Sequence, residues 1–182
     1  MIKIEDNILD NLQLKEIQNK LLSNHSIPMY FVDSVAYENE TDLGCYYHVH
    51  EVYEYPKGWL SDLGQTISPI LKYIKAKALV KIKINFYPRT EKIIKHGLHN
   101  DQSFKCKSAL FFVNDNDGYT YLKNENMKVE SKANRIVIFD GTRRHAGTTC
   151  TDEKTRMVIN LNFVPSNETN LEELQNNGLH SQ

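Results

Sequence analysis

The chain has 182 residues, of which 40% are hydrophobic and 25% are charged. This length is enough to bury one full core, so we expect a single domain over residues 1–182. The 22 basic and 23 acidic residues leave a formal charge of −1. This balance excludes a globally basic protein and gives no electrostatic reason to expect nucleic acid as a partner.

The first residues lack the apolar core of a secretory signal, and no stretch approaches the roughly 20 apolar residues that cross a bilayer. We therefore expect a cytoplasmic protein with no membrane partner. Its cysteines, Cys45, Cys106 and Cys150, are odd in number and widely spaced. This pattern argues against both a disulfide framework and a zinc site, so reduced thiols are expected.

Two helices are predicted in the first part of the chain. Residues 7–23 carry apolar side chains at roughly helical spacing, which are Ile8, Leu9, Leu12, Leu14, Ile17 and Leu21. A second helix is predicted to begin with Ser68 as its N-cap and Pro69 as its first residue. Its core-facing residues are expected to be Ile70, Leu71 and Ile74. Residues 1–78 would thus supply helical support and the segments around a substrate opening.

After residue 79 the hydrophobic period changes from that of a helix to that of a strand. Residues 80–87 alternate strictly, and Pro88 ends the run. Further strands are predicted over residues 108–114, 119–122, 127–130, 135–140 and 156–164. Between two of them, Asp117-Gly118 is a dipeptide typical of hairpins.

Many short strands after one or two helices predict a mainly β fold with flanking helices. We expect a double-stranded β-helix, also called a jelly roll or cupin-like barrel, with the helices packed on the major sheet. Its catalytic core would span residues 79–164, and residues 165–182 would form a C-terminal tail.

Two predicted strands have one polar face each. Asn85 and Tyr87 lie opposite the apolar residues of the first strand, and Arg156, Asn160 and Asn162 lie opposite those of the last. One interpretation exposes these polar faces to solvent, as in a half-buried antiparallel sheet. The other packs the apolar faces on helices and turns the polar faces into an interior that holds a small polar ligand. The second holds if the chain's histidines are metal ligands.

His99, Asp101 and His145 follow one another in the second half, and Arg156 comes 11 residues after the last of them. Two imidazoles and one carboxylate are what a mononuclear Fe(II) site needs when three coordination positions must stay open. A His-x-Asp pair alone is expected by chance in a chain with 7 His and 23 acidic residues. The order of the whole set among the strands is what carries weight, with Arg156 placed to anchor a dicarboxylate.

These residues resemble the Fe(II)- and 2-oxoglutarate-dependent dioxygenases, particularly the prolyl 4-hydroxylase-like branch. Tyr87-Pro88 followed by His99-x-Asp101 looks like the Tyr-Pro-Gly…His-x-Asp of the hypoxia-factor prolyl hydroxylases. Residues 108–114 look like their next strand, and residues 134–145 are similar to their Asp-Arg-Leu-Leu-Phe-Phe…His segment. Thr-Arg-Met-Val-Ile at 155–159 resembles their Thr-Arg-Tyr-Ala-Ile. The resemblance covers about residues 80–164.

The resemblance implies hydroxylation of an unactivated C–H with release of succinate and CO2. It assigns Fe(II) to the catalytic set His99, Asp101 and His145, and it assigns 2-oxoglutarate to Arg156, Tyr87 and Asn85. O2 is the second cosubstrate, and the need for ascorbate as a reductant stays open. A prolyl or other peptidyl substrate is favoured, with a small molecule as the alternative. The protein would be a monomer or a homodimer.

Some positions depart from the family pattern. Glycine does not follow Pro88, and a short insertion lies just before His96. Phe111 and Phe112 stand where a tyrosine often contacts the cosubstrate, so one contact is either missing or supplied elsewhere. His96 precedes His99 closely, but no carboxylate follows it at ligand spacing.

Two other functions stay open from the sequence. His48-Val49-His50-x-x-x-Glu54 imitates half of a cupin metal motif, so a cupin-type metalloenzyme that does not use 2-oxoglutarate is one of them. A catalytically silent jelly roll that binds a ligand is the other. Residues 46–59 are rich in rings and are typical of a strand and lid around an opening. His50 and Trp59 of this segment are candidate substrate contacts, and so is Arg144, which flanks His145.

Overall fold

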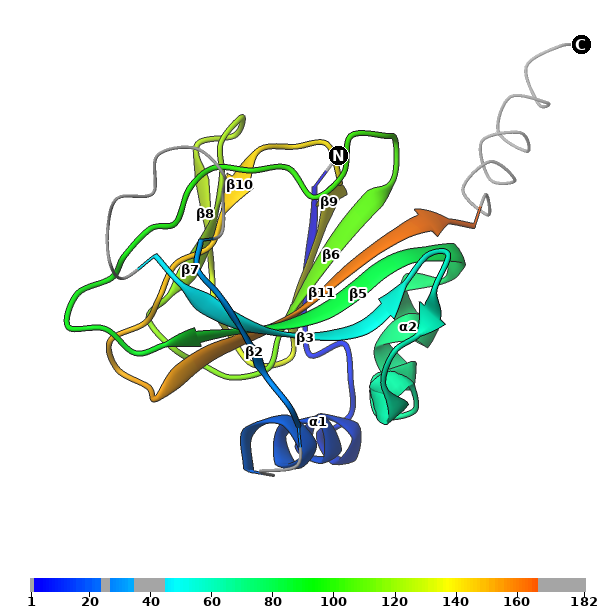
Figure 1. Cartoon of the computed structure of the whole chain (residues 1–182), viewed down its shortest axis with the longest axis horizontal. Coiled ribbons are helices and arrows are strands. Elements are labelled where there is room, and N and C mark those ends of the chain that lie inside the picture. Colours follow the sequence, from blue (N-terminus) through cyan, green and yellow to red (C-terminus); the bar gives the residue numbers. More distant parts are fainter. Residues whose placement is uncertain (1, 24–26, 35–44, 167–182) are drawn as a thin grey trace, which may run out of the picture.

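The computed structural model describes residues 2–23, 27–34 and 45–166. Its main feature is an eight-stranded sheet in the order β1-β9-β6-β11-β5-β3-β2, in which β4 also pairs with β3. A smaller sheet has the order β10-β7-β8, and every strand pairing is antiparallel. Figure 1 shows the two sheets facing each other across the interior, with both α-helices outside the main sheet. The fold is the expected jelly roll.

The strands and helices follow one another along the chain with these bounds. They are β1 (Lys3–Asp6), α1 (Asn11–Gln18), the π-helical turn η1 (Asn19–Ser23), β2 (Tyr30–Val32), β3 (Tyr47–Glu54), β4 (Gly58–Trp59), the 3-10 turn η2 (Asp62–Gly64), α2 (Ser68–Ile74), β5 (Ala76–Pro88), β6 (Lys107–Phe112), β7 (Tyr119–Leu122), β8 (Met127–Glu130), β9 (Arg135–Asp140), β10 (His145–Ala146) and β11 (Thr155–Pro165). Among the described residues, no helix has the length and apolar character needed to span a membrane.

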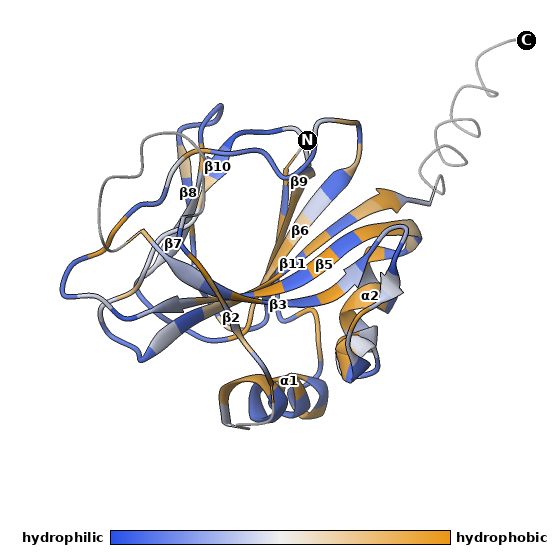
Figure 2. Cartoon of the chain, viewed as in Figure 1, coloured by the Kyte–Doolittle hydropathy of each residue, from blue (hydrophilic) through white to orange (hydrophobic). Residues whose placement is uncertain are grey.

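Strands β5 and β11 pair at the centre of the main sheet and separate two environments. On the outer face, apolar side chains such as Ile82, Ile84 and Ile159 pack against the helices. On the inner face, Arg156 and Asn160 are only 1% and 2% exposed although they are polar. Figure 2 shows hydrophobic and hydrophilic residues alternating along both strands. The interpretation that places the polar faces in the interior is therefore confirmed, and the solvent-facing one is wrong.

The first helix is shorter than predicted, and one of its expected core residues is exposed. Asp10 caps α1 through a reciprocal pair of hydrogen bonds with Gln13, so the regular helix begins at Asn11. Ile17 and Leu21 are buried, whereas Leu12 is 78% exposed. Five residues of α-helix turn through about 140° beyond one full rotation, which carries Leu12 away from the stripe that contains Ile17. The spacing of hydrophobic residues alone therefore predicted a wider buried face for this helix than the structure has.

The second helix lies where it was predicted, with its cap shifted by one residue. Ser68 is the first helical residue, and its side chain makes no capping hydrogen bond because Ile67 occupies the N-cap position. Ile70 and Ile74 are buried, and Leu71 packs against the same core cluster. The helix ends at Ile74, and its C-cap residue Lys75 adopts a left-handed conformation (φ 48°).

The predicted hairpin at Asp117-Gly118 is wrong. β6 pairs with β9 and β11, whereas β7 pairs with β8 and β10, so this dipeptide lies in the connection between two sheets. The tight turn instead joins β7 to β8, and its Asn126 has a φ of 50°. The short strands β1, β2, β4 and β10 were also missed, and β2, β4 and β10 have only two or three residues, which carry too little alternation to detect.

Asn134, the residue before β9, hydrogen-bonds to Leu9 just before α1, and its replacement should destabilise the fold. Its side-chain oxygen accepts from the Leu9 N–H at 3.0 Å, and its Nδ2 donates to the Leu9 carbonyl at 2.8 Å. Its φ is 64°. Asn134→Ala is expected to lower the free energy of unfolding by about 2–4 kcal/mol, from two buried hydrogen bonds and left-handed strain.

Asn134→Gly separates these two causes, since glycine accepts a positive φ. It should cost about 1 kcal/mol less than the alanine variant in urea denaturation. Equal destabilisation by both variants would show that the backbone conformation contributes nothing.

Candidate metal centre

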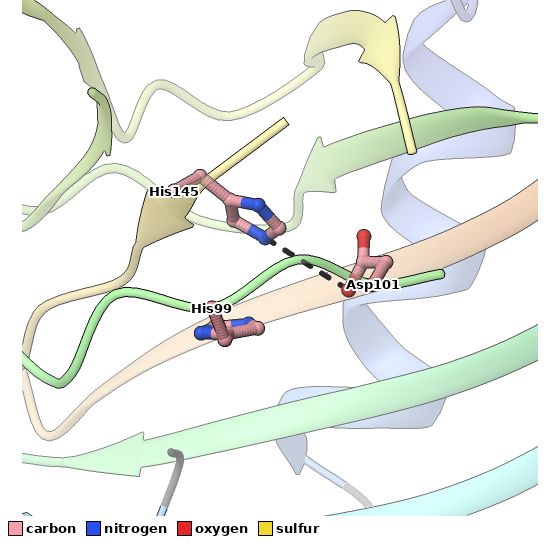
Figure 3. A group of neighbouring side chains, drawn as sticks. All are labelled: His99, Asp101 and His145. Atoms are coloured by element: carbon pink, nitrogen blue, oxygen red, sulfur yellow. Dashed lines mark ion pairs between the residues drawn. The ribbon is translucent and has the colours of Figure 1, made fainter. Parts of the chain in front are cut away.

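His99 and His145 are held opposite each other by a two-residue antiparallel bridge. The His99 N–H donates to the His145 carbonyl at 2.9 Å, and the His145 N–H donates to the His99 carbonyl at 2.8 Å. Directly opposed residues present their side chains on the same face, and the two ring centroids are 4.5 Å apart. Asp101, two residues further on, returns to that face. One donor atom from each residue lies within 4.8 Å of the others (Figure 3).

Both imidazoles are oriented by backbone carbonyls. The Nδ1 of His99 lies 3.2 Å from the Gly97 carbonyl, and the Nδ1 of His145 lies 3.1 Å from the Arg143 carbonyl. Because a carbonyl only accepts, each Nδ1 carries the proton and each Nε2 keeps its lone pair. Burial, together with the nearby His145, lowers the pKa of His99 to about 4. His99 is therefore a neutral donor at neutral pH.

Asp101 is an ionised carboxylate in spite of its burial. Its side chain is 2% exposed, and it accepts hydrogen bonds from Ser108, Asn160 and Asn162 at 2.6, 3.1 and 3.1 Å. Burial alone would raise its pKa, but electrostatic interaction with the nearby His145 and Lys83 and the hydrogen bond from the Ser108 hydroxyl together hold the pKa well below its ordinary value. The cluster thus offers two neutral nitrogens and one anionic oxygen.

This donor set fits a mononuclear divalent ion such as Fe(II), because imidazole and carboxylate ligands suit that metal and the carbonyl contacts free both Nε2 atoms. Within the described residues it is the only group of three such side chains close enough to share an ion. His96 lies outside this group, and its ring packs on Tyr87 at 5.2 Å.

The two histidines of the rival cupin-like motif, His48 and His50, lie on the other face of the sheet. On β3, His48 and His50 are opposite Phe86 and Ile84, which belong to the apolar face toward the helices. Glu54 binds Lys57 and Lys81. The described residues around this half-motif complete no group of three donors.

A small enclosed cavity adjoins the two histidines, and Arg156, Tyr87 and Asn85 all line it. Gly147 also lines it: an added Cβ would lie 3.2 Å from the Tyr87 hydroxyl and 3.5 Å from Arg156 Nη1. Glycine therefore keeps the space before the guanidinium open. The residues predicted to hold a cosubstrate meet beside the predicted metal ligands.

Arg156 is a buried cation whose described partners are all neutral. Its Nε donates to the Ser131 hydroxyl at 2.7 Å, and its Nη2 donates to the Thr120 hydroxyl at 2.8 Å. The guanidinium lies 5.2 Å from the Tyr87 ring centre and 5.5 Å from that of Phe112. In the described part of the chain no carboxylate forms an ion pair with it. An uncompensated buried charge is costly, so this arrangement favours an anion in the cavity.

Tyr87 and Asn85 add hydrogen-bonding groups to the same cavity. Burial raises the pKa of Tyr87, so its phenol stays protonated and is able to donate. The Asn85 amide lies 3.4 Å from that hydroxyl, and its Oδ1 has no hydrogen-bond partner among the described residues. An unpartnered polar atom that is buried here is consistent with a polar ligand.

Sequence reasoning missed the residues that hold the site in place. Thr120, Ser131 and the Thr148 carbonyl hold Arg156, and no sequence pattern distinguishes them from ordinary strand and loop residues. Gly118 has a different role from the turn predicted for it. A Cβ there would lie 2.6 Å from Arg156 Cδ, so the glycine makes room for this arginine.

The two phenylalanines occupy different faces of β6. Phe111 belongs to the helix-facing core, whereas Phe112 lies under the guanidinium of Arg156. Leu110, not either phenylalanine, lines the cavity. The position of the family's tyrosine is thus filled by apolar side chains.

The predicted substrate contacts are not gathered at the cluster. His50 points toward the Pro28 carbonyl at 2.8 Å, and Trp59 packs edge-on against Tyr53 at 5.2 Å, both away from the cavity. Arg144 is exposed and donates to the Leu98 carbonyl at 3.1 Å, next to His99. A groove does open beside Asp101, and its lining includes Lys83 and Gln102.

No family model and no curated protein matches this chain. Several solved structures do match it. A viral collagen prolyl hydroxylase from Paramecium bursaria Chlorella virus-1 superposes with a TM-score of 0.59 at 11% identity, over 90% of this chain and 96% of its own. A prolyl hydroxylase from Trichoplax adhaerens, solved with a hypoxia inducible factor peptide fragment, gives 0.59 at 15% identity over 100% and 87%.

A third match is the non-heme alpha-ketoglutarate-dependent epimerase SnoN from nogalamycin biosynthesis, with a TM-score of 0.63 at 11% identity over 90% of this chain and 77% of its own. At these identities the matches establish the fold. The chain shares its jelly-roll fold with these prolyl hydroxylases and this epimerase, as its resemblance to the prolyl hydroxylase-like branch predicted.

The depressed pKa of His99 predicts how the stability of the metal-free protein depends on pH. The folded state protonates His99 only near pH 4, whereas the unfolded chain does so near the ordinary value of 6.5. Stability should therefore fall as the pH drops from 6.5 toward 4, by roughly 2 kcal/mol at pH 4.5 from this group. Urea denaturation in the presence of a chelator measures it. His99→Gln should lack this component, and equal pH dependence in both proteins would contradict the assignment.

Proposed function

We propose that this protein is an Fe(II)- and 2-oxoglutarate-dependent dioxygenase that hydroxylates an unactivated C–H of its substrate and releases succinate and CO2. The observation that carries the proposal is the buried Arg156, which has no acidic partner among the described residues and lies in a cavity that His99 and His145 also line. A group of metal-ligand side chains and an anion site meet at one cavity. This arrangement matches a cosubstrate that chelates a metal at one end and carries a carboxylate at the other.

His99, Asp101 and His145 would hold the metal. Fe(II) together with 2-oxoglutarate and O2 supplies the oxidising power, which no side chain has. Arg156 would bind the distal carboxylate of 2-oxoglutarate by charge-assisted hydrogen bonds from the N–H groups that its Nη1 and Nη2 do not use for Thr148 and Thr120, while Ser131 fixes its Nε. Tyr87 would donate a further hydrogen bond to the same carboxylate.

The rest of the cavity would orient the cosubstrate and exclude water. Leu110 and Val158 line it with apolar surface, and Phe112 covers one side of the guanidinium. A charge interaction in such a water-poor site is stronger than in solvent. The cavity has a volume of only about 20 Å³, so its walls would have to move apart to admit the cosubstrate, and the substrate would enter elsewhere.

The groove beside Asp101 would be that entrance. Its lining includes Tyr47, Lys83, Gln102 and Asn162. Asp101 lines this groove and is also one of the three proposed metal ligands, so a substrate C–H group in the groove would lie next to the metal. We propose a prolyl or other peptidyl residue as the substrate, a choice supported by the peptide-bound Trichoplax enzyme of the same fold.

An anaerobic titration tests the proposal. Fe(II)-loaded protein should develop a weak visible charge-transfer band on addition of 2-oxoglutarate, and the band should saturate. Asp101→Ala should abolish it by removing the anionic donor. Arg156→Met should weaken 2-oxoglutarate binding about 10²-fold or more, because it removes a charged pair buried from water.

Arg135→Met is the matched control, since Arg135 pairs with Asp6 outside the cavity. It should leave the band unchanged. His50→Ala tests the cupin alternative: if that variant loses the metal while His99→Ala keeps it, the proposed centre is wrong. An absent band in metal-loaded wild-type protein would reject the use of 2-oxoglutarate.

A further inference from the structure

The two carboxylate oxygens of Asp101 have different surroundings. Oδ1 lies 3.8 Å from the Nε2 of His145 and accepts one hydrogen bond, from the Asn160 amide at 3.1 Å. Oδ2 accepts two, from the Ser108 hydroxyl at 2.6 Å and from the Asn162 amide at 3.1 Å. Figure 3 shows Oδ1 directed toward the imidazole of His145. One oxygen therefore faces the other metal ligands, and its hydrogen-bonding capacity is only partly used.

The two donors to Oδ2 are fixed by the main sheet. Ser108 on β6 and Asn162 on β11 are directly opposite each other in the strand register, and they are 0% and 2% exposed. The Asn162 amide also lies 2.9 Å from the Ser108 hydroxyl and 3.2 Å from the Asn160 side-chain oxygen. These contacts bind the donors to one another, so neither moves freely with Asp101.

A carboxylate binds a metal through one oxygen or through both. An oxygen that already accepts two hydrogen bonds has both of its lone pairs engaged. For Oδ2 to join the metal, the bonds from Ser108 and Asn162 would have to break, and the buried Ser108 hydroxyl would lose its acceptor at a cost of about 1–3 kcal/mol. The surroundings of Asp101 thus oppose two-oxygen coordination.

We infer that Ser108 and Asn162 are positioning residues that hold Asp101 to the metal through Oδ1 alone. The inference rests on the proposed function. A site of two imidazoles and one carboxylate oxygen leaves three of six positions open, enough for a chelating cosubstrate and O2. A second carboxylate oxygen would occupy one of them. Ser108 and Asn162 would therefore determine whether 2-oxoglutarate is able to chelate the metal.

The test separates affinity for the metal from affinity for the cosubstrate. Ser108→Ala, Asn162→Leu and the double variant would be titrated anaerobically with Fe(II) against a chelating dye. Each Fe(II)-loaded protein would then be titrated with 2-oxoglutarate by its visible band. The variants should keep their Fe(II) affinity, because a second oxygen replaces the lost support. Their 2-oxoglutarate affinity should fall about 10–100-fold, with the largest fall in the double variant.

Thr142→Ala is the matched control, because its hydroxyl also donates to a carboxylate, that of Asp140 at 2.7 Å, away from the cluster. It should change neither affinity. Ser108→Ala removes only one oxygen atom, so this variant still provides the test if Asn162→Leu does not fold.

Unchanged 2-oxoglutarate affinity in Ser108→Ala and in every folded asparagine variant would overturn the inference. A fall in Fe(II) affinity would overturn it as well, since the two residues would then only support the ligand. If the wild-type protein itself gives no band, the proposed function fails instead, and the two failures are distinguished by that one sample.

Discussion

The arrangement of the site depends on the positive charge of Arg156, which no acidic residue in the described part of the chain neutralises. Arg156 is 1% exposed at the centre of the main sheet, and its hydrogen-bond partners are hydroxyl and carbonyl oxygens. Isolated buried cations are avoided because desolvation is not repaid. Gly118 leaves room for the side chain, and Gly147 leaves open space in front of it. So much structure around one unpaired guanidinium is best explained by an anionic ligand.

His99 and Asp101, in the connection between β5 and β6, meet His145 of the smaller sheet through simple backbone pairing. A single bridge between His99 and His145 sets both rings on one face, and the two-residue period of an extended chain returns Asp101 to it. Strand β11 then contributes along its inner face to both parts of the site: Arg156 to the anion cavity, and Asn160 and Asn162 to the Asp101 carboxylate. The apolar face of the same strand packs on the helices and fixes these positions.

Much of this could be predicted from the sequence, because the strict alternation of residues 80–87 and 156–164 reveals both faces of the central strands. The order of His99, Asp101, His145 and Arg156 likewise predicted which residues would meet, since antiparallel neighbours bring them together. What failed depends on tertiary contact. Gly118 has the local signature of a hairpin, but its small size serves a side chain 38 positions later in the chain.

Other residues could not be predicted because their role arises only in the folded state. Thr120 and Ser131 look like ordinary β and loop residues until Arg156 reaches them. Trp59 and His50 share a ring-rich segment with Tyr47, yet the pleat turns His50 toward the helices and Tyr47 onto Tyr87. A sequence shows which residues alternate, but it does not show which face of an isolated strand meets the site.

A crystal structure of the protein grown anaerobically with Fe(II) and 2-oxoglutarate would test the central claim most directly. The account predicts one metal ion bound by His99, Asp101 and His145, and a distal carboxylate within hydrogen-bonding distance of Arg156 and Tyr87. Metal at His48 and His50, or a cosubstrate whose distal carboxylate lies away from Arg156, would contradict it.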